Sequence, residues 1–189
     1  VARVWEYRLD EDQPWIAYQL IPGETLASLI AVRTVSVTEA IRIFTCVAEA
    51  LEDIHRVGIA HGDVAPDNVM VTPAGDAVVI DLGAARFGEG SDFSRAGFGK
   101  DGFRSPEFWD GVTPGPSADI WALGVCLALA TGGIRPFGGT PASVVQAVMY
   151  EPPNLGDGSG PFTEVIEACL EKSPSSRPAA GQVVSMLKR

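Results

Sequence analysis

The stretch of sequence that decides the fold is the loop His61-Gly62-Asp63-Val64-Ala65-Pro66-Asp67-Asn68. It places a carboxylate, Asp63, and an amide, Asn68, in a polar segment that follows a helix-like apolar pattern and precedes two strand-like runs. Oxygen atoms of these two kinds bind hard metal ions and orient reacting hydroxyl groups. The loop is therefore the first candidate for a site of chemistry.

The elements on either side of this loop are predicted by local signals. Upstream, Ser36-Val37-Thr38-Glu39 is a capping box that opens a helix, and Gly58 ends it. Apolar residues recur between these points with helical spacing, at Ile41, Phe44, Val47, Ala48, Leu51 and Ile54. Downstream, residues 69–71 and 77–80 are predicted strands around a turn at 73–76.

Four further motifs follow the loop in order. They are Asp81-Leu82-Gly83, Ser105-Pro106-Glu107, Asp119-Ile120-Trp121-Ala122-Leu123-Gly124 and Ser176-Arg177-Pro178. Each is weak alone, because a chain with 24 acidic residues contains short acidic patterns by chance, and a solvated loop acid or a helix cap explains any single one. The five motifs together, each in a fitting local context, indicate one shared function.

The rest of the chain is predicted to be mostly helical. Aromatic and branched runs at 4–9 and 15–20 flank a polar turn and indicate a hairpin, and a short helix is expected at 25–31. Residues 82–104 are rich in glycine, serine and charge and are predicted to be a long loop. Further helices are expected at 117–131, 140–150, 162–171 and 179–188. The predicted fold class is α+β in a single domain.

Composition narrows the classes of function. The net charge of −10 disfavours sequence-independent binding of nucleic acid and weakly favours basic protein substrates. Cys46, Cys126 and Cys169 lie far apart without metal or disulfide spacing, so we expect free thiols and a cytoplasmic location. The longest apolar stretch, 120–130, is too short to cross a bilayer, so no membrane segment is expected within these residues.

The ordered motifs resemble those of the protein kinase superfamily, in its eukaryotic-like Ser/Thr branch found in bacteria. The resemblance covers essentially the whole chain. It implies an α+β, protein kinase-like domain at 1–189 that is mainly the helical C-lobe. Residues 1–21 resemble the last strands of the N-lobe and the hinge, and residues 22–189 resemble the C-lobe.

The resemblance implies specific roles in transfer of the ATP γ-phosphate. Phosphoryl transfer depends mostly on positioning and charge neutralisation. Asp63 matches the catalytic base that accepts or orients the substrate hydroxyl. Asn68 and Asp81 match the ligands of Mg ions that bridge the phosphates. The implied substrate is Ser or Thr of a protein.

Other motif residues match positions that build the family's architecture. Glu107 and Arg177 match an ion pair that joins the end of the activation segment to a late helix. Asp119 matches the buried acid that holds the catalytic loop by hydrogen bonds. His61 and Leu82 match stacked residues that link the two lobes.

The nucleotide pocket is implied by four residues. Tyr18 matches the gatekeeper, Gln19 and Ile21 match the hinge, and Met70 matches the floor of the adenine pocket. For Tyr18 and Met70, a plain role in the core is an equal alternative.

The sequence departs from the family pattern at its start. These residues contain no glycine-rich loop before the first hairpin, and the only lysines, Lys100, Lys172 and Lys188, lie far downstream. The usual cation on the phosphates is therefore not found in this stretch. We expect the active species to include an N-lobe supplied by a segment outside these residues or by a partner chain.

Three further departures lie in and near the loop. Ala65 stands where Ser/Thr kinases have a lysine, and Lys100 stands where they have a threonine that contacts the catalytic aspartate. We interpret Lys100 as a replacement for the lost charge, with a solvated loop lysine as the alternative. Gly62 replaces the arginine that reads a phosphate on the activation loop, so phosphorylation of Ser91 or Ser94 is predicted to be dispensable.

The main functional prediction is a protein Ser/Thr kinase domain. One alternative is a pseudokinase or regulatory scaffold that binds a partner through the surface left by the missing N-lobe, although a pure scaffold has no need for Asp63, Asn68 and Asp81. A second alternative is a small-molecule phosphotransferase of the aminoglycoside type, which His61-Gly62-Asp63 resembles. The Ser105-Pro106-Glu107 motif and Arg177 argue against it, because they build a platform for peptide substrates.

Overall fold

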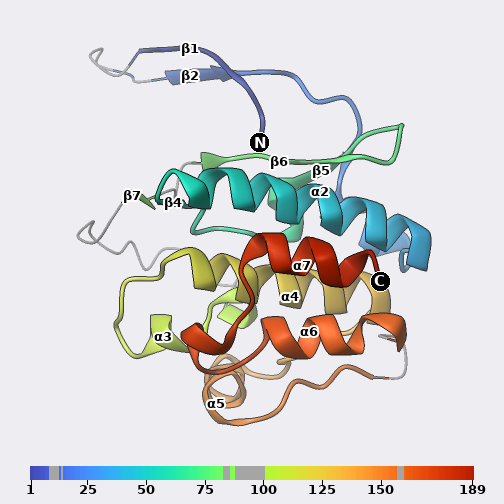
Figure 1. Ribbon diagram of the computed structural model, residues 1–189, viewed down its shortest axis with the longest axis vertical. Coiled ribbons are helices and arrows are strands. Elements are labelled where there is room, and N and C mark those ends of the chain that lie inside the picture. The colour runs from blue at the N-terminus through green and yellow to red at the C-terminus, as the bar shows by residue number, and fades with distance from the viewer. Residues whose placement is uncertain (9–12, 14, 83–85, 88–100, 157–159) are drawn as a thin grey trace.

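A β-hairpin and a helical body form the two parts of the chain (Figure 1). The computed structural model describes residues 1–8, 13, 15–82, 86–87, 101–156 and 160–189. The hairpin consists of β1 (Val4–Arg8) and β2 (Trp15–Tyr18), which pair antiparallel. Its aromatic and branched residues favour strands, and Arg3 and Arg8 lie over the rings of Trp5 and Trp15.

A second, three-stranded sheet connects the hairpin to the body. It has the order β3 (Glu24–Thr25), β5 (Val69–Val71) and β6 (Ala77–Val79), and both pairings are antiparallel. The N–H of Ala2 donates to the carbonyl of Val79 over 2.9 Å, which joins the start of the chain to β6. The short helix α1 (Leu26–Val32) follows β3 directly.

The long helix α2 (Val37–Arg56) separates the sheet from the other helices. Ser36 and Glu39 form the capping box at its start. Its apolar face is buried, because β6 packs on one side of it and α4 and α7 pack on the other (Figure 1). Gly58, with φ of 77°, takes the left-handed conformation just after the helix ends.

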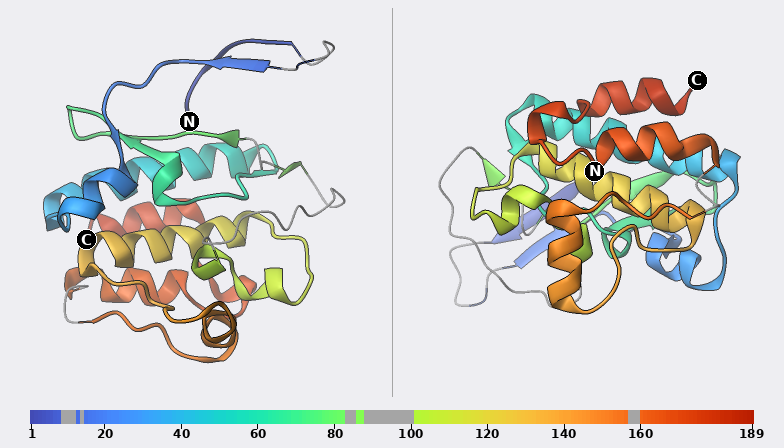
Figure 2. Two further views of the ribbon diagram at one scale, coloured as in Figure 1. Left: turned by 180° about the vertical axis from the view of Figure 1, so that it is seen from behind. Right: turned by 90° about the horizontal axis from the view of Figure 1, so that it is seen from below.

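The central helix α4 (Pro116–Gly132) is the core of the body. All residues from 119 to 128 are buried, as expected for an apolar helix surrounded by other elements. A Cβ on Gly124 would meet the Cβ of Cys169 at 2.6 Å, so only glycine allows α6 (Thr163–Cys169) to approach this closely. The helix α7 (Ala180–Leu187) covers α2, and α5 (Pro141–Tyr150) lies at the foot of the body (Figure 2).

Most predicted elements are confirmed, with ends shifted by a few residues. The predicted helix at 162–171 is shorter because a 3-10 turn (Gly160–Phe162) precedes α6. The loop predicted at 82–104 is wrong in two places. Its residues Arg86–Phe87 form β7, which pairs with β4 (Ile59–Ala60), and Asp101–Phe103 form a 3-10 turn before α3 (Pro106–Trp109).

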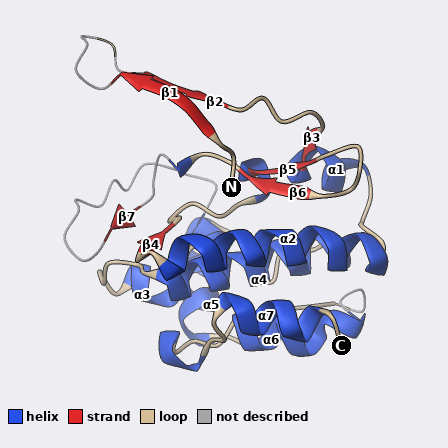
Figure 3. Ribbon diagram, turned by 45° about the horizontal axis from the view of Figure 1, so that its top comes forward, coloured by secondary structure: helices blue, strands red, loops and turns tan. Residues whose placement is uncertain are grey.

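These errors have a common physical reason. Two-residue strands carry no periodic pattern of their own, and their backbone groups are paired only because a distant segment lies beside them (Figure 3). Among the described residues, no helix combines the length and the apolar character needed to cross a membrane.

Candidate active site

The loop at 61–68 is attached to the start of α4 by a single buried carboxylate. Asp119, of which only 2% is exposed, accepts the backbone N–H of His61 over 2.8 Å and that of Gly62 over 2.9 Å. Gly62 has φ of 77°, a conformation that glycine adopts without strain. The loop therefore takes its shape from a helix that begins more than fifty residues later in the chain.

A third donor to this carboxylate was missed by the sequence analysis. His55, in the last turn of α2, lies with Nε2 at 2.8 Å from the Asp119 carboxylate. Because a carboxylate only accepts, this imidazole nitrogen donates. In the sequence, this role of His55 is indicated only by its place as a polar residue next to Ile54, near the end of the predicted helix and shortly before Gly58.

The side chain of His61 connects the loop to the strand that follows it. His61 is fully buried, its Nδ1 accepts the N–H of Asp63 over 3.3 Å, and its Nε2 donates to the carbonyl of Ile80 over 3.1 Å. The backbone N–H of the same residue, Ile80, donates to the carbonyl of Asn68 over 2.9 Å. These bonds bring both ends of the loop to the residue that directly precedes Asp81.

Asp63 and Asn68 are in direct contact. The amide nitrogen of Asn68 donates to the Asp63 carboxylate over 2.9 Å and to its backbone carbonyl over 2.7 Å. Asn68 is buried at the end of the 3-10 turn Pro66–Asn68, while Asp63 is half-buried. The amide oxygen of Asn68 is not used in either bond and is the atom able to bind a cation.

Asp81 stands in an unusual backbone conformation. Its φ of 62° is the only positive value at a non-glycine residue in the described part of the chain, and its side chain is exposed. Such a conformation is costly and is found most often at functional sites. Leu82, the next residue, is half-buried and packs against the main core.

Asn68 and Asp81 offer two oxygen donors, which are the kind of ligand that magnesium prefers. Two donors are too few for a metal ion that is held by protein side chains alone. Among the residues described, no three His, Cys, Asp or Glu side chains gather into a potential metal site. Mg²⁺ is commonly held by one or two protein oxygens together with phosphates and water. One carboxylate and one amide oxygen, linked through Ile80, are compatible with this chemistry.

The residues matched to the nucleotide pocket lie outside the main core. Tyr18 is 37% exposed at the end of β2, and the N–H of Gln19 donates to the carbonyl of Arg3 over 2.7 Å. Ile21 is half-buried in the connection to β3. Met70 is half-buried in β5 and pairs with Thr25 of β3 and Val78 of β6.

The predicted pair of Glu107 and Arg177 is present and buried. The two terminal nitrogens of the Arg177 guanidinium, Nη1 and Nη2, each lie 2.8 Å from one carboxylate oxygen of Glu107. Arg177 also donates to the carbonyls of Ser117, Glu171 and Lys172. Burial acts to raise the pKa of Glu107, but the hydrogen bonds and charge of Arg177 outweigh it and hold the pKa below its ordinary value. The pair joins α3 to the turn before α7.

Lys100, Ser91 and Ser94 lie outside the described residues. The predicted role of Lys100 and the predicted dispensability of the two serines therefore stay predictions.

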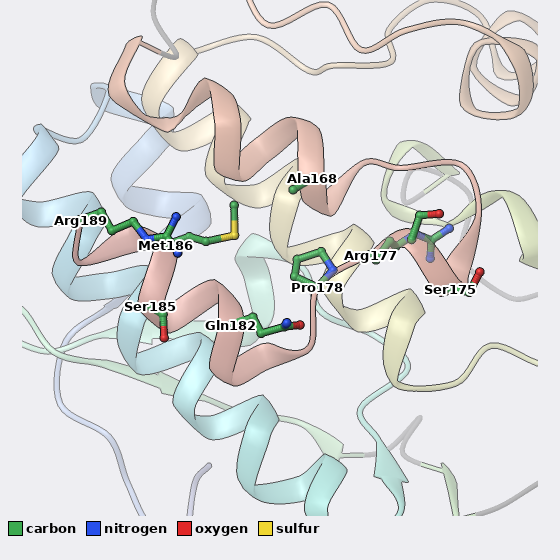
Figure 4. Close-up of a pocket in the computed structure, with 9 residues that line it drawn as sticks. Ala168, Ser175, Arg177, Pro178, Gln182, Ser185, Met186 and Arg189 are labelled. Carbon is green, nitrogen blue, oxygen red and sulfur yellow. The ribbon is translucent and has the colours of Figure 1, made fainter.

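A shallow groove runs along α7, and the loop at 61–68 does not line it. It has a volume of about 620 Å³, and Figure 4 shows Arg177 and Ser175 at one end and Arg189 and Met186 at the other. Neither Asp63 nor Asn68 lines it. The candidate active site is thus the surface around the loop rather than this groove.

The chain belongs to the protein kinase family. The family model described as "Protein kinase domain" matches residues 1–187. The probable serine/threonine-protein kinase PkwA of Thermomonospora curvata is 31% identical over 180 residues, which are 93% of this chain and 24% of that protein. The serine/threonine-protein kinase PknA of Mycobacterium tuberculosis is 31% identical over 174 residues, or 88% of this chain and 40% of that protein.

The similarity extends to longer bacterial proteins. The serine/threonine-protein kinase AfsK of Streptomyces coelicolor is 29% identical over 179 residues, which cover 92% of this chain and 22% of that protein. The chain therefore spans less than half the length of these three relatives.

Proposed function

We propose that this chain carries the catalytic residues for transfer of the γ-phosphate of ATP to Ser or Thr of a protein. The observation that carries this proposal is the contact between Asp63 and Asn68 in a loop that Asp119 and His61 fix from two sides. Positioned groups of this kind are what phosphoryl transfer requires, since the reaction depends mainly on geometry and electrostatics.

In this proposal Asp63 receives or orients the proton of the attacking hydroxyl. Its carboxylate is half-buried, and the amide of Asn68 holds one of its oxygens at 2.9 Å, which fixes the orientation of the group. His61 supports the backbone of Asp63 from below.

Asn68 and Asp81 would hold magnesium beside the phosphates. When bound, the ion supplies charge neutralisation for the phosphoryl group. The chain's own contribution would be the amide oxygen of Asn68 and the carboxylate of Asp81. The bond from the N–H of Ile80 to the backbone carbonyl of Asn68 ties the two segments together, and Asp81 follows with a positive φ. Tyr18, Gln19, Ile21 and Met70 would line the adenine side.

We further propose that residues 1–21 act as the end of an N-lobe and residues 22–189 as the C-lobe. Exposed aromatic residues on both strands of the hairpin support this division, because Trp5, Tyr7 and Trp15 are 61%, 59% and 41% exposed. Surfaces of this kind are usually covered by a partner. A further segment or a partner chain would cover them and complete the nucleotide site.

A cytoplasmic location fits the same proposal. Cys169 is free and buried, and burial raises the pKa of its thiol to about 12. Thiols of this kind persist in a reducing compartment, which is also where ATP is available.

Phosphate transfer from labelled ATP to a mixture of Ser- and Thr-containing peptides tests the proposal. We expect transfer by the wild-type protein, assayed together with the segment or partner chain that completes the nucleotide site. We expect a loss of about 100-fold or more in Asp63→Asn, which keeps the shape but removes the base. Calorimetric titration of Mg-ATP, with Asp81→Asn as the matched variant, separates binding from chemistry. Binding that survives unchanged in Asp81→Asn would contradict the assigned metal ligand.

A scaffold without catalysis is the second candidate function. The exposed hairpin favours it, together with Ala65 at a position where Ser/Thr kinases have a lysine. If wild type and Asp63→Asn are equally inactive while both bind the same partner protein, the scaffold is the better description.

A further inference from the structure

Lys172 makes contacts that no sequence motif accounts for. It follows α6, and its ammonium donates to the carbonyl of Ala147 over 3.1 Å and to that of Val148 over 2.7 Å. These carbonyls belong to the last turn of α5, where a helix favours positive charge; that of Ala147 also accepts the N–H of Glu151 over 2.9 Å. A side chain that lies 24 and 25 residues further along the chain therefore caps α5.

The same ammonium lies against two stacked aromatic rings. Trp121 of α4 and Phe137 stack with their centroids 5.2 Å apart, and both residues are buried. The Lys172 nitrogen is 4.4 Å from the centroid of Phe137 and 5.1 Å from that of Trp121. A cation at these distances is attracted to the rings, so Lys172 joins the end of α5 to the core.

Groups of both signs act on the ammonium of Lys172. Burial and the positive charge of Arg177 lower the pKa of Lys172 to about 8, while Glu151 at the end of α5 acts to raise it. Arg177 is itself paired with Glu107. The ammonium therefore loses its proton within a range of pH that can be reached while the protein stays folded.

The helix α5, which Lys172 caps, packs against the turn Asp101–Phe103. This turn precedes the Ser105-Pro106-Glu107 motif. A Cβ on Gly102 would lie 3.3 Å from the carbonyl oxygen of Phe137 and 3.9 Å from Val144 of α5. Arg135 lies over the ring of Phe103, at 5.6 Å from its centroid. The turn that contains Gly102 and Phe103 thus rests on α5 and on the segment around Phe137, and it leads directly into Ser105-Pro106-Glu107 (Figure 2).

We propose that Lys172 is a positioning residue for the protein substrate, because it holds α5 and Phe137 beneath the turn at Gly102 and Phe103. This inference rests on the proposed kinase function. The catalytic loop is held by different bonds, which run from the backbone N–H groups of His61 and Gly62 to Asp119, two residues before Trp121 in α4. Lys172 therefore affects binding of the protein substrate and leaves ATP binding and the chemical step nearly unchanged.

Steady-state kinetics of three variants of the full chain test the proposal. In Lys172→Met we expect the KM for a peptide substrate to rise about tenfold, which corresponds to losing one charge-assisted contact, with kcat and the KM for ATP within about twofold. Lys172→Arg keeps the cation and should recover most of the loss. Lys188→Met is the control, since Lys188 is an exposed lysine paired only at the surface with Glu49.

The pH profile adds a measurement on the unmutated protein. Because the contacts of Lys172 need the ammonium, the peptide KM of the wild type should rise as pH increases from 7 to 9, through the pKa of about 8. In Lys172→Arg the guanidinium keeps its charge and the profile should flatten. A merely structural role for the side chain would not produce this difference.

Hydrogen exchange separates a failure of this inference from a failure of the proposed function. In Lys172→Met, amides at 101–106 and 147–151 should exchange faster, while those at 61–68 stay protected. If exchange changes in this way but the wild type transfers no phosphate, the positioning role holds and the kinase assignment fails. If exchange at 101–106 is unaltered, or if ATP and peptide KM change equally, the positioning role is overturned.

Discussion

The loop at 61–68 and the N-terminal hairpin are two small segments that are held in opposite ways. The loop is held by buried and partly buried bonds to elements far away in the sequence, such as those that the backbone N–H groups of His61 and Gly62 donate to Asp119. The hairpin is held by its own strand pairing and by exposed contacts such as Glu6 with Arg8, whose side chains are 55% and 47% exposed.

This difference between the loop and the hairpin shows which kinds of contact make a segment rigid. A buried acceptor must be satisfied, so each bond in the loop is costly to break and fixes one geometry. An exposed ion pair exchanges its partner for water with little change in free energy. We infer that the loop keeps its shape in the folded chain without any partner, whereas the hairpin depends on whatever covers its aromatic residues.

The buried pair of Glu107 and Arg177 should give the largest effect of any single substitution. Arg177→Met leaves a buried carboxylate without its partner, and we expect unfolding free energy to fall by about 3–5 kcal/mol. Urea denaturation measures this change. The double variant Arg177→Met with Glu107→Leu should recover part of the loss, since no charge is then left unpaired. Additive losses in the double variant would contradict this account.

The Asp119 carboxylate comes next in size. Asp119→Asn replaces one acceptor oxygen by an amide that must face a donor, and we expect a loss of about 2 kcal/mol together with faster exchange of the His61 and Gly62 amides. Asp110→Asn is the matched control, because Asp110 is exposed at the end of α3. Equal behaviour of the two variants would remove the distinction between the loop and the exposed surface.

Glu39 is an intermediate case, exposed but fixed to a helix end. Its bonds to Arg33, and then to the backbone and side chain of Ser36, lower its pKa to about 2. Because the folded pKa lies below the unfolded value, its contribution is complete above about pH 4.5 and is lost as pH falls toward 2. In Glu39→Gln, stability between pH 5 and 3 should fall less steeply than in wild type.

The hairpin should show the smallest effect. Arg8→Ala removes the ion pair with Glu6 and the contact with Trp15, and we expect unfolding free energy to change by less than about 1 kcal/mol. Thermal unfolding followed by circular dichroism measures it. A loss as large as that of Asp119→Asn would show that the hairpin is held as firmly as the loop. That result would contradict the difference between the two segments.

The sequence alone determined the elements whose signals are local. The capping box at Ser36 and Glu39 and the apolar spacing along α2 specify a helix without reference to the rest of the chain. The order of motifs from Asp63 to Arg177 was enough to indicate the family, and the family model and relatives bear this out. The pair of Glu107 and Arg177 could be expected only through that resemblance.

Only the tertiary structure decided the contacts between distant positions. The bond from His55 to Asp119, the pairing of β4 with β7 and the capping of α5 by Lys172 each join residues that no periodic pattern connects. Buried polar groups accept whichever partner the packing brings within reach, and packing depends on the whole chain. The sequence therefore fixed which residues could perform chemistry, and the fold decided which side chains hold them in place.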